Sequence, residues 1–296
     1  SGVEARVDVK PAYGLSDEQI AAMLQDSTLG HSSLDAPQAG AQSRTGLFPA
    51  GASPMPGPAP SCWSDLMDRR NFLTMSGLGL AGLMGAGRTE FAMSLFGKSW
   101  GHKITGDVSM HGKPVDVSTI PKAIEAGLAY VTEDRKHLGL VLQNNIKENT
   151  TLANLNGVSS GTIIDDRKEA KVASDYRQKL RIRSHSIYQE AVNLSGGNQQ
   201  KVVLSKWLFT NPEILILDEP TRGIDVGAKF EIYTIINQLA AEGKGILMIS
   251  SEMPELLGTC DRIYVMNEGR IVAELSKEEA SQESIMRAIM RSGEKH

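Results

Sequence analysis

Residues 82–89, GLMGAGRT, have the composition and spacing of a phosphate-binding loop. Four residues separate Gly82 from Gly87, and a basic and a hydroxyl side chain, Arg88 and Thr89, follow directly. Such glycines allow backbone N–H groups to converge on phosphate oxygens, and the N-terminus of the following helix adds positive charge. The hydroxyl of Thr89 is placed to bind Mg²⁺. A glycine-rich turn without a ligand is the alternative that this motif alone leaves open.

Two adjacent carboxylates, Asp218 and Glu219, follow the wholly apolar run Ile214–Leu217. Acids at the end of a buried strand are costly unless they meet a metal or a polar ligand. We expect Asp218 to hold Mg²⁺ through water and Glu219 to polarise an attacking water. A strand end with solvated acids is the alternative, and the phosphate-binding loop makes it the weaker one.

A second glycine pair opens another helix in residues 194–201, LSGGNQQK. Ser195 precedes Gly196 and Gly197, and residues 202–208 continue with an apolar helical pattern. This arrangement predicts a second helix N-terminus that can bind an anion. A capped helix without a ligand is the alternative.

The elements that must position these motifs alternate between strands and helices. Short apolar runs bounded by turn residues indicate buried strands, and apolar side chains at helical spacing indicate amphipathic helices. This alternation predicts an α/β fold with a parallel sheet covered on both faces. The predicted strands are residues 78–81, 126–132, 214–217, 246–249, 262–266 and 270–275, the last two forming a hairpin. The predicted helices are residues 89–96, 165–180 and 228–241, together with the helix that Ser195 and the two glycines open and that includes the apolar residues up to Leu208.

Together the motifs resemble those of the ATP-binding-cassette (ABC) family of P-loop NTPases. The serine–glycine motif, the apolar strand ending in two acids, and Asp225 in the following turn carry that resemblance. From about residue 78 to residue 296 the chain resembles more closely the C-terminal cassette of ATPases that import ribose, galactose or xylose. The segments that carry this likeness are GLMGAGRTE, YVTEDRK, LSGGNQQK, LDEPTRGIDVGAK and ISSEMPEL.

The resemblance implies an ABC-type ATPase with a parallel-sheet core and a helical subdomain, its N-terminal antiparallel strands missing. It also implies head-to-tail pairing of two cassettes, with each ATP between the loop of one and the serine–glycine motif of the other. ATP and Mg²⁺ are the implied cofactors. The implied contacts to this chain's own nucleotide are Gly82, Gly85, Ala86, Gly87, Arg88, Thr89 and Glu90, those to Mg²⁺ are Thr89, Glu133 and Asp218, and the implied catalytic residues are Glu219 and Ser251. The implied contacts to the partner's ATP are Leu194, Ser195, Gly196, Gly197, Asn198 and Gln199, with Asp225 in the adjoining D-loop.

Three residues depart from the general cassette pattern. Arg88 replaces a lysine, Glu133 replaces a glutamine, and Ser251 replaces a histidine that would reach the γ-phosphate. A wide guanidinium fits poorly where a compact ammonium is usual, and a serine hydroxyl stabilises developing charge less than a histidine does. We therefore expect a degenerate site on this chain's own loop, and an intact serine–glycine motif that serves the partner's site.

Composition excludes several other classes of protein. The chain has 296 residues, 41% hydrophobic and 22% charged, as in globular proteins, and a formal net charge of −4 that gives no footprint for nucleic acid. The two cysteines, Cys62 and Cys260, exclude a disulfide scaffold. No apolar run approaches the ~20 residues of a membrane helix.

The N-terminal quarter differs in character from the rest. Residues 7–27 resemble a fragment of DnaK-like chaperones, with a short strand near Val7 and a helix start at Ser16, and residues 68–74 resemble a twin-arginine export signal. Residues 37–60 hold six of the twelve prolines, which is typical of a linker. The expected divisions are a fragment over residues 1–26, a linker over 27–77, and a cassette over 78–296 with its helical subdomain at about 134–200.

The leading hypothesis is an ATP-hydrolysing subunit of a monosaccharide importer, peripheral to the cytoplasmic face of the inner membrane. Its expected partners are a second cassette, membrane permease subunits docked on residues 134–137 and 144–155, and indirectly a periplasmic sugar-binding protein. The alternatives are a non-hydrolysing partner cassette and a truncated or fused remnant without function. A soluble cassette ATPase of translation or DNA repair is disfavoured, because the net charge is negative and basic runs are absent.

Overall fold

The computed structural model describes residues 7–10, 77–101 and 104–293. The expected helix start at Ser16, the linker and the twin-arginine-like segment lie outside these residues. The strand expected near Val7 is confirmed as β1, Val7–Lys10.

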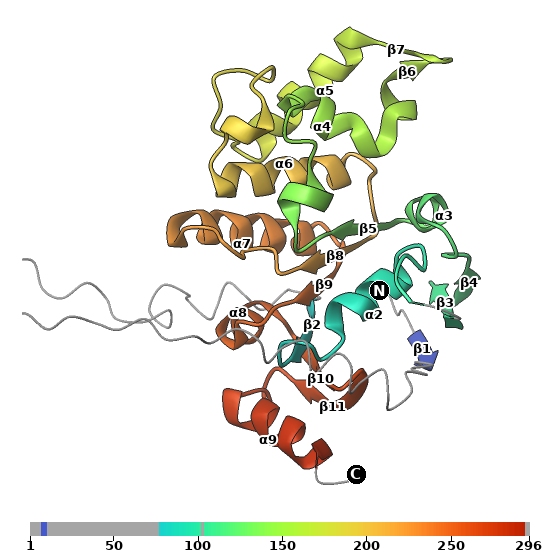
Figure 1. The fold of residues 1–296 in the computed structure, drawn as a ribbon, viewed down its shortest axis with the longest axis vertical. Helices are drawn as coiled ribbons and strands as arrows, with labels where there is room; N and C mark the ends of the chain where they lie inside the picture. Colours follow the sequence, from blue (N-terminus) through green and yellow to red (C-terminus); the bar gives the residue numbers. More distant parts are fainter. Residues whose placement is uncertain (1–6, 11–76, 102–103, 294–296) are drawn as a thin grey trace, which may run out of the picture. The chain divides into compact units, whose positions relative to one another are not determined.

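A six-stranded sheet in the order β11-β10-β2-β9-β8-β5 forms the centre of the fold (Figure 1). The strands are β2 (Gly77–Gly82), β5 (Leu128–Val131), β8 (Ile214–Asp218), β9 (Gly245–Ile249), β10 (Arg262–Asn267) and β11 (Arg270–Ser276). All neighbours are parallel except β10 and β11, which form the expected hairpin. The predicted fold class and all six predicted strands are therefore confirmed.

Alternate residues of the central strands enter two different hydrophobic cores. Leu215 and Leu217 of β8 pack in one core with side chains from α6 and α7, whereas Ile216 packs in the other with side chains from α2. Strand side chains alternate between faces, so a wholly apolar strand requires cover on both sides. The continuous apolar runs in the sequence reflect this double burial.

The helices begin where the sequence provides caps. The Asp165 and Asp225 carboxylates accept hydrogen bonds from the first turns of α5 and α7, and Asn145 forms a capping box with Glu148 at α4. The α-helices are α2 (Arg88–Leu95), α3 (Ile120–Glu125), α4 (Ile146–Thr151), α5 (Asp166–Lys179), α6 (Gly196–Leu208), α7 (Val226–Ala241), α8 (Met253–Thr259) and α9 (Gln282–Gly293). Short turns of other helix types are η1 (Arg135–Gly139), η2 (Leu152–Val158) and η3 (Ala191–Asn193). The four predicted helices are confirmed as α2, α5, α6 and α7.

Two small antiparallel sheets accompany the main one. The first has the order β1-β3-β4, with β3 at Thr105–Met110 and β4 at Lys113–Val115, and the second pairs β6 (Ser159–Ser160) with β7 (Ile163–Ile164). The sequence did not predict β3, β4, β6 or β7, because they are short and largely polar or exposed.

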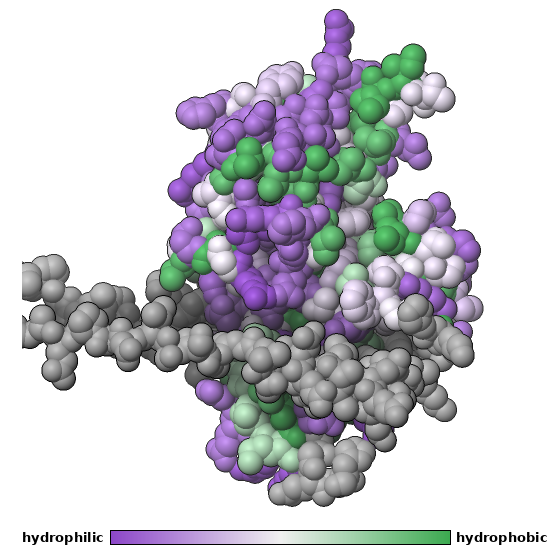
Figure 2. Space-filling view, in the orientation of Figure 1, coloured by the Kyte–Doolittle hydropathy of each residue, from purple (hydrophilic) through white to green (hydrophobic). Residues whose placement is uncertain are grey.

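Apolar side chains reach the surface on the helical region that follows β5. Leu138, Val141, Leu152 and Leu155 are each 40% or more exposed, as are Ile163 and Ile164 of β7. Figure 2 shows a band of hydrophobic surface over the part that Figure 1 assigns to α4 and α6, and more at the β6–β7 hairpin. Within the expected docking segment 144–155, five residues of α4 are buried against α5 and α6, whereas Leu152 and Leu155 are exposed. None of the helices in the described part of the chain has the length and apolar character needed to span a membrane.

Lys206 gives the fold a pH-dependent stability. It is 6% exposed, its Nζ donates to Gly139 O at 2.5 Å, and burial lowers its pKa to about 8. The pKa of a lysine in an unfolded chain is ~10.4. Between these two values the unfolded chain binds more protons than the folded chain, so stability rises with pH across that window.

We therefore compare the stability of Lys206→Met with that of the native chain at two pH values. The difference, variant minus native, should be about 2 kcal/mol smaller at pH 10 than at pH 7.5. Urea unfolding at the two pH values measures this change. Lys171→Met, at an exposed position on α5, is the control and should show no such change with pH. An equal pH response of Lys206→Met and the native chain would contradict the prediction.

Candidate functional site

The glycine-rich loop joins β2 to α2 in the geometry of a phosphate cradle. Gly85 and Gly87 have φ of +79° and +91°, in the left-handed region that glycine favours, and the Ala86 N–H donates to Leu83 O at 3.0 Å. A Cβ on Gly82 would lie 2.5 Å from Met266 O, whereas one on Gly85 would meet open space. The loop is therefore packed on one side and open on the other. The N–H groups of the first turn of α2 have no partner within their own helix and are suited to bind phosphate oxygens.

Arg88, the first residue of α2, points into the protein. It is 7% exposed, its guanidinium donates to Ser250 O at 2.5 Å, and a guanidinium nitrogen lies 3.6 Å from Glu219 Oε1. Burial lowers the pKa of Arg88, and the charges of Glu219 and Asp218 oppose that shift. The structure thus brings Arg88 together with Glu219, which the sequence did not predict.

Asp218 lies at the carboxyl end of β8, fully buried. Tyr130 on the neighbouring β5 donates its hydroxyl to Asp218 Oδ2 at 2.8 Å, and Oδ1 is buried without a hydrogen-bond partner in the described part of the chain. Burial raises the pKa of Asp218, and the Thr89 side chain lies close enough to oppose that rise. A half-satisfied buried carboxylate beside a threonine fits Mg²⁺, which proteins commonly hold by one or two carboxylates together with substrate phosphates.

Glu219 is held in a strained backbone conformation beside Asp218. Its φ is +45°, which costs a non-glycine residue of order 1–3 kcal/mol, and its N–H donates to Ile249 O at 2.9 Å. Burial raises the pKa of Glu219, and Ser251 and Arg88 oppose the rise. The structure therefore brings together both expected catalytic residues, Glu219 and Ser251.

Glu133 follows β5 and is engaged by a different partner. Its carboxylate forms an ion pair with Arg222, in the turn after β8. Arg135, two residues on, donates to Arg222 O at 2.7 Å and to Gly223 O at 3.2 Å. Of the expected metal ligands, Asp218 and Thr89 lie together, and Glu133 is engaged by Arg222. Among the described residues no cluster of three or more His, Cys, Asp or Glu side chains could hold a metal ion.

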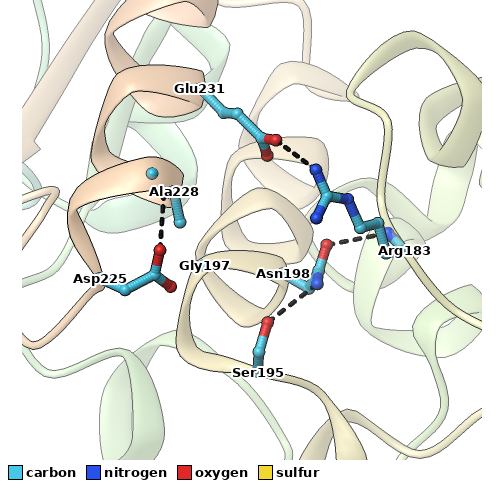
Figure 3. A pocket seen from close by; sticks show the side chains of 8 residues that line it. Arg183, Ser195, Gly197, Asn198, Asp225, Ala228 and Glu231 are labelled. Carbon is cyan, nitrogen blue, oxygen red and sulfur yellow. Dashed lines mark hydrogen bonds and ion pairs between the residues drawn. The ribbon is translucent and has the colours of Figure 1, made fainter. Parts of the chain in front are cut away.

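A polar pocket of about 170 Å³ lies at the second site, the N-terminus of α6 (Figure 3). The Ser195 side chain does not cap its own helix; its hydroxyl accepts a hydrogen bond from Asn198 Nδ2 at 2.9 Å. Asp225 lies across the pocket and accepts the Ala228 N–H at 2.9 Å. The pocket is lined by Arg183, Ser195, Gly197, Asn198, Asp225, Gly227, Ala228 and Glu231. Of the motif residues outside this lining, Leu194 and Gln199 are buried and Gly196 is partly exposed.

Close packing explains both glycines of this motif. A Cβ on Gly197 would lie 2.5 Å from Ala228 Cβ of α7, and one on Gly196 would lie 2.8 Å from an Arg135 guanidinium nitrogen. These distances are shorter than side-chain carbons tolerate. Packing against Ala228 therefore requires glycine at position 197, whereas a side chain at position 196 would have to displace the Arg135 guanidinium.

Two residues at the pocket rim were not predicted from the sequence. The residues are Arg183 and Glu231, and Arg183 donates to Glu231 Oε1 at 2.7 Å (Figure 3). Behind the lining, the buried Lys201 of α6 donates to Glu231 Oε2 at 2.6 Å. Glu231 of α7 thus links two segments of the helical region to the core. No short motif marks these residues, because the pairs join positions far apart in the sequence.

Comparisons with known proteins agree with this geometry. Residues 74–222 match the family model described as "ABC transporter". The chain is 59% identical over 214 residues to the L-arabinose transport ATP-binding protein AraG of Geobacillus stearothermophilus, covering 72% of this chain and 42% of that protein. It is 54% identical over 209 residues to the xylose import ATP-binding protein XylG of Geobacillus kaustophilus, covering 71% of this chain and 41% of that protein. It is 51% identical over 211 residues to the ribose import ATP-binding protein RbsA of Clostridium perfringens, covering 71% of this chain and 42% of that protein. The chain therefore spans about two fifths of the length of these relatives.

Solved structures share the fold at low sequence identity. The ADP form of the ATP-binding cassette MJ1267 aligns with a TM-score of 0.59 and 22% identity, covering 73% of this chain and 88% of that chain. A nucleotide-free cassette of an ABC transporter aligns with a TM-score of 0.58 and 22% identity, covering 72% and 83%. At this identity the likeness establishes the fold alone.

We expect the packing constraint at Gly197 to be testable by a matched pair of variants. Gly197→Ala should lose about 1–3 kcal/mol of stability, because its new methyl group overlaps Ala228 and overpacks the α6–α7 contact. Gly227→Ala, on the same pocket, should be neutral or slightly stabilising, since its new Cβ would meet only Asp225 Oδ1 at 3.4 Å. Chemical unfolding of both variants measures the difference. Equal stability of the two variants would rule the packing explanation out.

Proposed function

The chain belongs to the ABC transporter family, and from this premise we propose that it is an ATP-binding subunit that energises the import of a monosaccharide. The observation that carries the proposal is the presence of two glycine-lined helix N-termini on one chain, one beside Asp218 and Glu219 and one beside Asp225. The relatives' names, which refer to L-arabinose, xylose and ribose, support a sugar as cargo.

In the proposed mechanism each residue of the first site has a distinct role. The amides of Gly85 and Gly87 and the first turn of α2 bind the phosphates of ATP, and Asp218 and Thr89 hold Mg²⁺. Bound Mg²⁺ supplies neutralisation of the phosphate charge. Glu219 orients and polarises the attacking water, and Ser251 contacts the transferred phosphoryl group.

The second site acts on the ATP of a partner cassette. Ser195, Gly196 and Gly197 donate hydrogen bonds to the partner's γ-phosphate, and Asp225 lies at the seam between the cassettes. The Ser195 hydroxyl suits this role because it does not cap α6, so it remains available to an outside acceptor. Closure of the two cassettes around ATP drives the permease, and hydrolysis resets it.

The two sites are proposed to be unequal. Arg88 is directed at Glu219 and Ser250, and Glu133 is paired with Arg222, so both side chains are engaged away from the phosphate loop. In the pocket at Ser195 the ion pair of the lining joins Arg183 to Glu231 and does not include Ser195 or Gly197. The site completed by the partner's loop and this chain's Ser195 motif is therefore proposed as the working one.

The helical region is proposed as the docking surface for the permease, at the cytoplasmic face of the membrane. Leu138 lies on η1, Val141 follows it, and Leu152 and Leu155 lie on η2, all exposed and apolar. Apolar patches of this kind mark interaction sites. A sugar-binding protein would act through the permease, without touching this chain.

A non-hydrolysing partner cassette is the second candidate function, and the ion pair between Arg88 and Glu219 favours it. In that case the site at residues 82–89 would bind ATP without hydrolysing it. The two candidates differ only in whether Glu219 contributes to turnover.

We expect matched serine variants to separate the two sites in the assembled transporter. Ser195→Ala should lower ATP turnover about tenfold or more, since it removes a donor to the transferred phosphoryl group. Ser251→Ala and Glu219→Gln should remove no more than about half of the turnover, the share of one of two equal sites. Phosphate release from the full transporter measures each effect. Complete loss of turnover in Glu219→Gln would overturn the assignment of the working site.

A further inference from the structure

Arg88 connects the phosphate loop to the ends of two strands. From the first turn of α2 its guanidinium reaches Ser250 O, directly after β9, and approaches Glu219, directly after β8. Arginine can do both at once, because its planar fork presents several N–H donors in fixed directions. A lysine ammonium is a compact charge on a flexible stem and lacks this fork.

Both anchors of the guanidinium are themselves fixed. Glu255 of α8 is 2% exposed and accepts a hydrogen bond from Ser250 Oγ at 2.7 Å, and Ser250 Oγ in turn accepts the Glu252 N–H at 3.0 Å. Glu219 is held by its N–H bond to Ile249 O. The guanidinium therefore donates to one fixed carbonyl and lies beside a carboxylate whose backbone is fixed, so releasing it requires breaking contacts inside a closely packed region.

The contact between Arg88 and Glu219 occupies two charged groups of the proposed nucleotide site. The Arg88 charge is drawn toward a carboxylate and a carbonyl, and Glu219 Oε1 lies beside a cation. Since both side chains are 10% exposed or less, water screens this attraction weakly. Phosphate must therefore compete with Glu219 for the charge of Arg88.

We propose that Arg88 is a positioning residue that clamps Glu219 to the end of β9, and that this clamp lowers the affinity of the phosphate loop for Mg-ATP. The inference rests on the proposed function, because it concerns the same nucleotide site. It also gives a physical reason for the unequal sites: the substitution of arginine for lysine creates an internal partner for the acid.

The test is a double-mutant cycle on the purified full-length chain, with Mg-ATP affinity measured by calorimetric titration. Arg88→Lys should bind Mg-ATP about 3- to 10-fold more tightly, since the ammonium no longer spans both acceptors and is free for phosphate. Glu219→Gln should also tighten binding, because it removes the competing charge from the other side. The double variant should gain less than the product of the two single effects, since both changes release the same clamp.

The control is Arg287→Lys, the same change in an exposed pair with Glu283 on α9, which should leave the affinity unchanged. If Arg88→Lys fails to fold, the near-isosteric Glu219→Gln tests the same contact. If the native chain binds Mg-ATP and Arg88→Lys binds equally or more weakly, or if the two single effects multiply, the clamp is refuted while the proposed function stands. If none of the chains binds Mg-ATP, even with a partner cassette, the proposed function and the clamp both fall.

Discussion

The parallel register of β2, β9 and β8 is the constraint on which the first site depends. Leu80 pairs with Ile249, and Asp218 pairs with the same Ile249, so the carboxyl ends of all three strands meet at one edge. The phosphate loop, the two acids and the Ser250–Ser251 pair follow these strand ends directly. A buried edge that concentrates two carboxylates is costly without a ligand or a cation, which is why Arg88, Tyr130 and Thr89 gather there.

The turn after β8 extends this constraint to the second site. It starts at Glu219, is bound by Glu133 and Arg135 at Arg222 and Gly223, and ends at Asp225, the cap of α7. Arg135 also packs against Gly196 at the start of α6. Residues 219–225 therefore connect Glu219 of the first site with Asp225 of the second. Arg135 holds this segment by hydrogen bonds to the main-chain carbonyls of Arg222 and Gly223.

The motifs and central strands could be predicted because their signals are local. The glycine spacing of residues 82–89 and the apolar run of residues 214–217 each reflect a constraint within one segment. The direction of Arg88 could not be predicted, since a P-loop cation and an internal ion pair require the same residue type. Glu133 was expected at the metal, and its ion pair with Arg222 could not be predicted because the two residues are distant in sequence. Residues 144–155 were expected to dock the permease, and the sequence did not show that α4 is largely buried by α5 and α6 while Leu152 and Leu155 are exposed.

The central claim is that the two glycine cradles of this chain grip the phosphates of different nucleotides. A structure of the chain in complex with its partner cassette and a non-hydrolysable Mg-ATP analogue tests it most directly. We expect one nucleotide on the loop of residues 82–89, and a second, carried by the partner's loop, with its terminal phosphate within hydrogen-bond distance of the Ser195 hydroxyl and the Gly197 amide. A complex in which the Ser195 pocket faces solvent, with nucleotide bound to the partner, would contradict the claim.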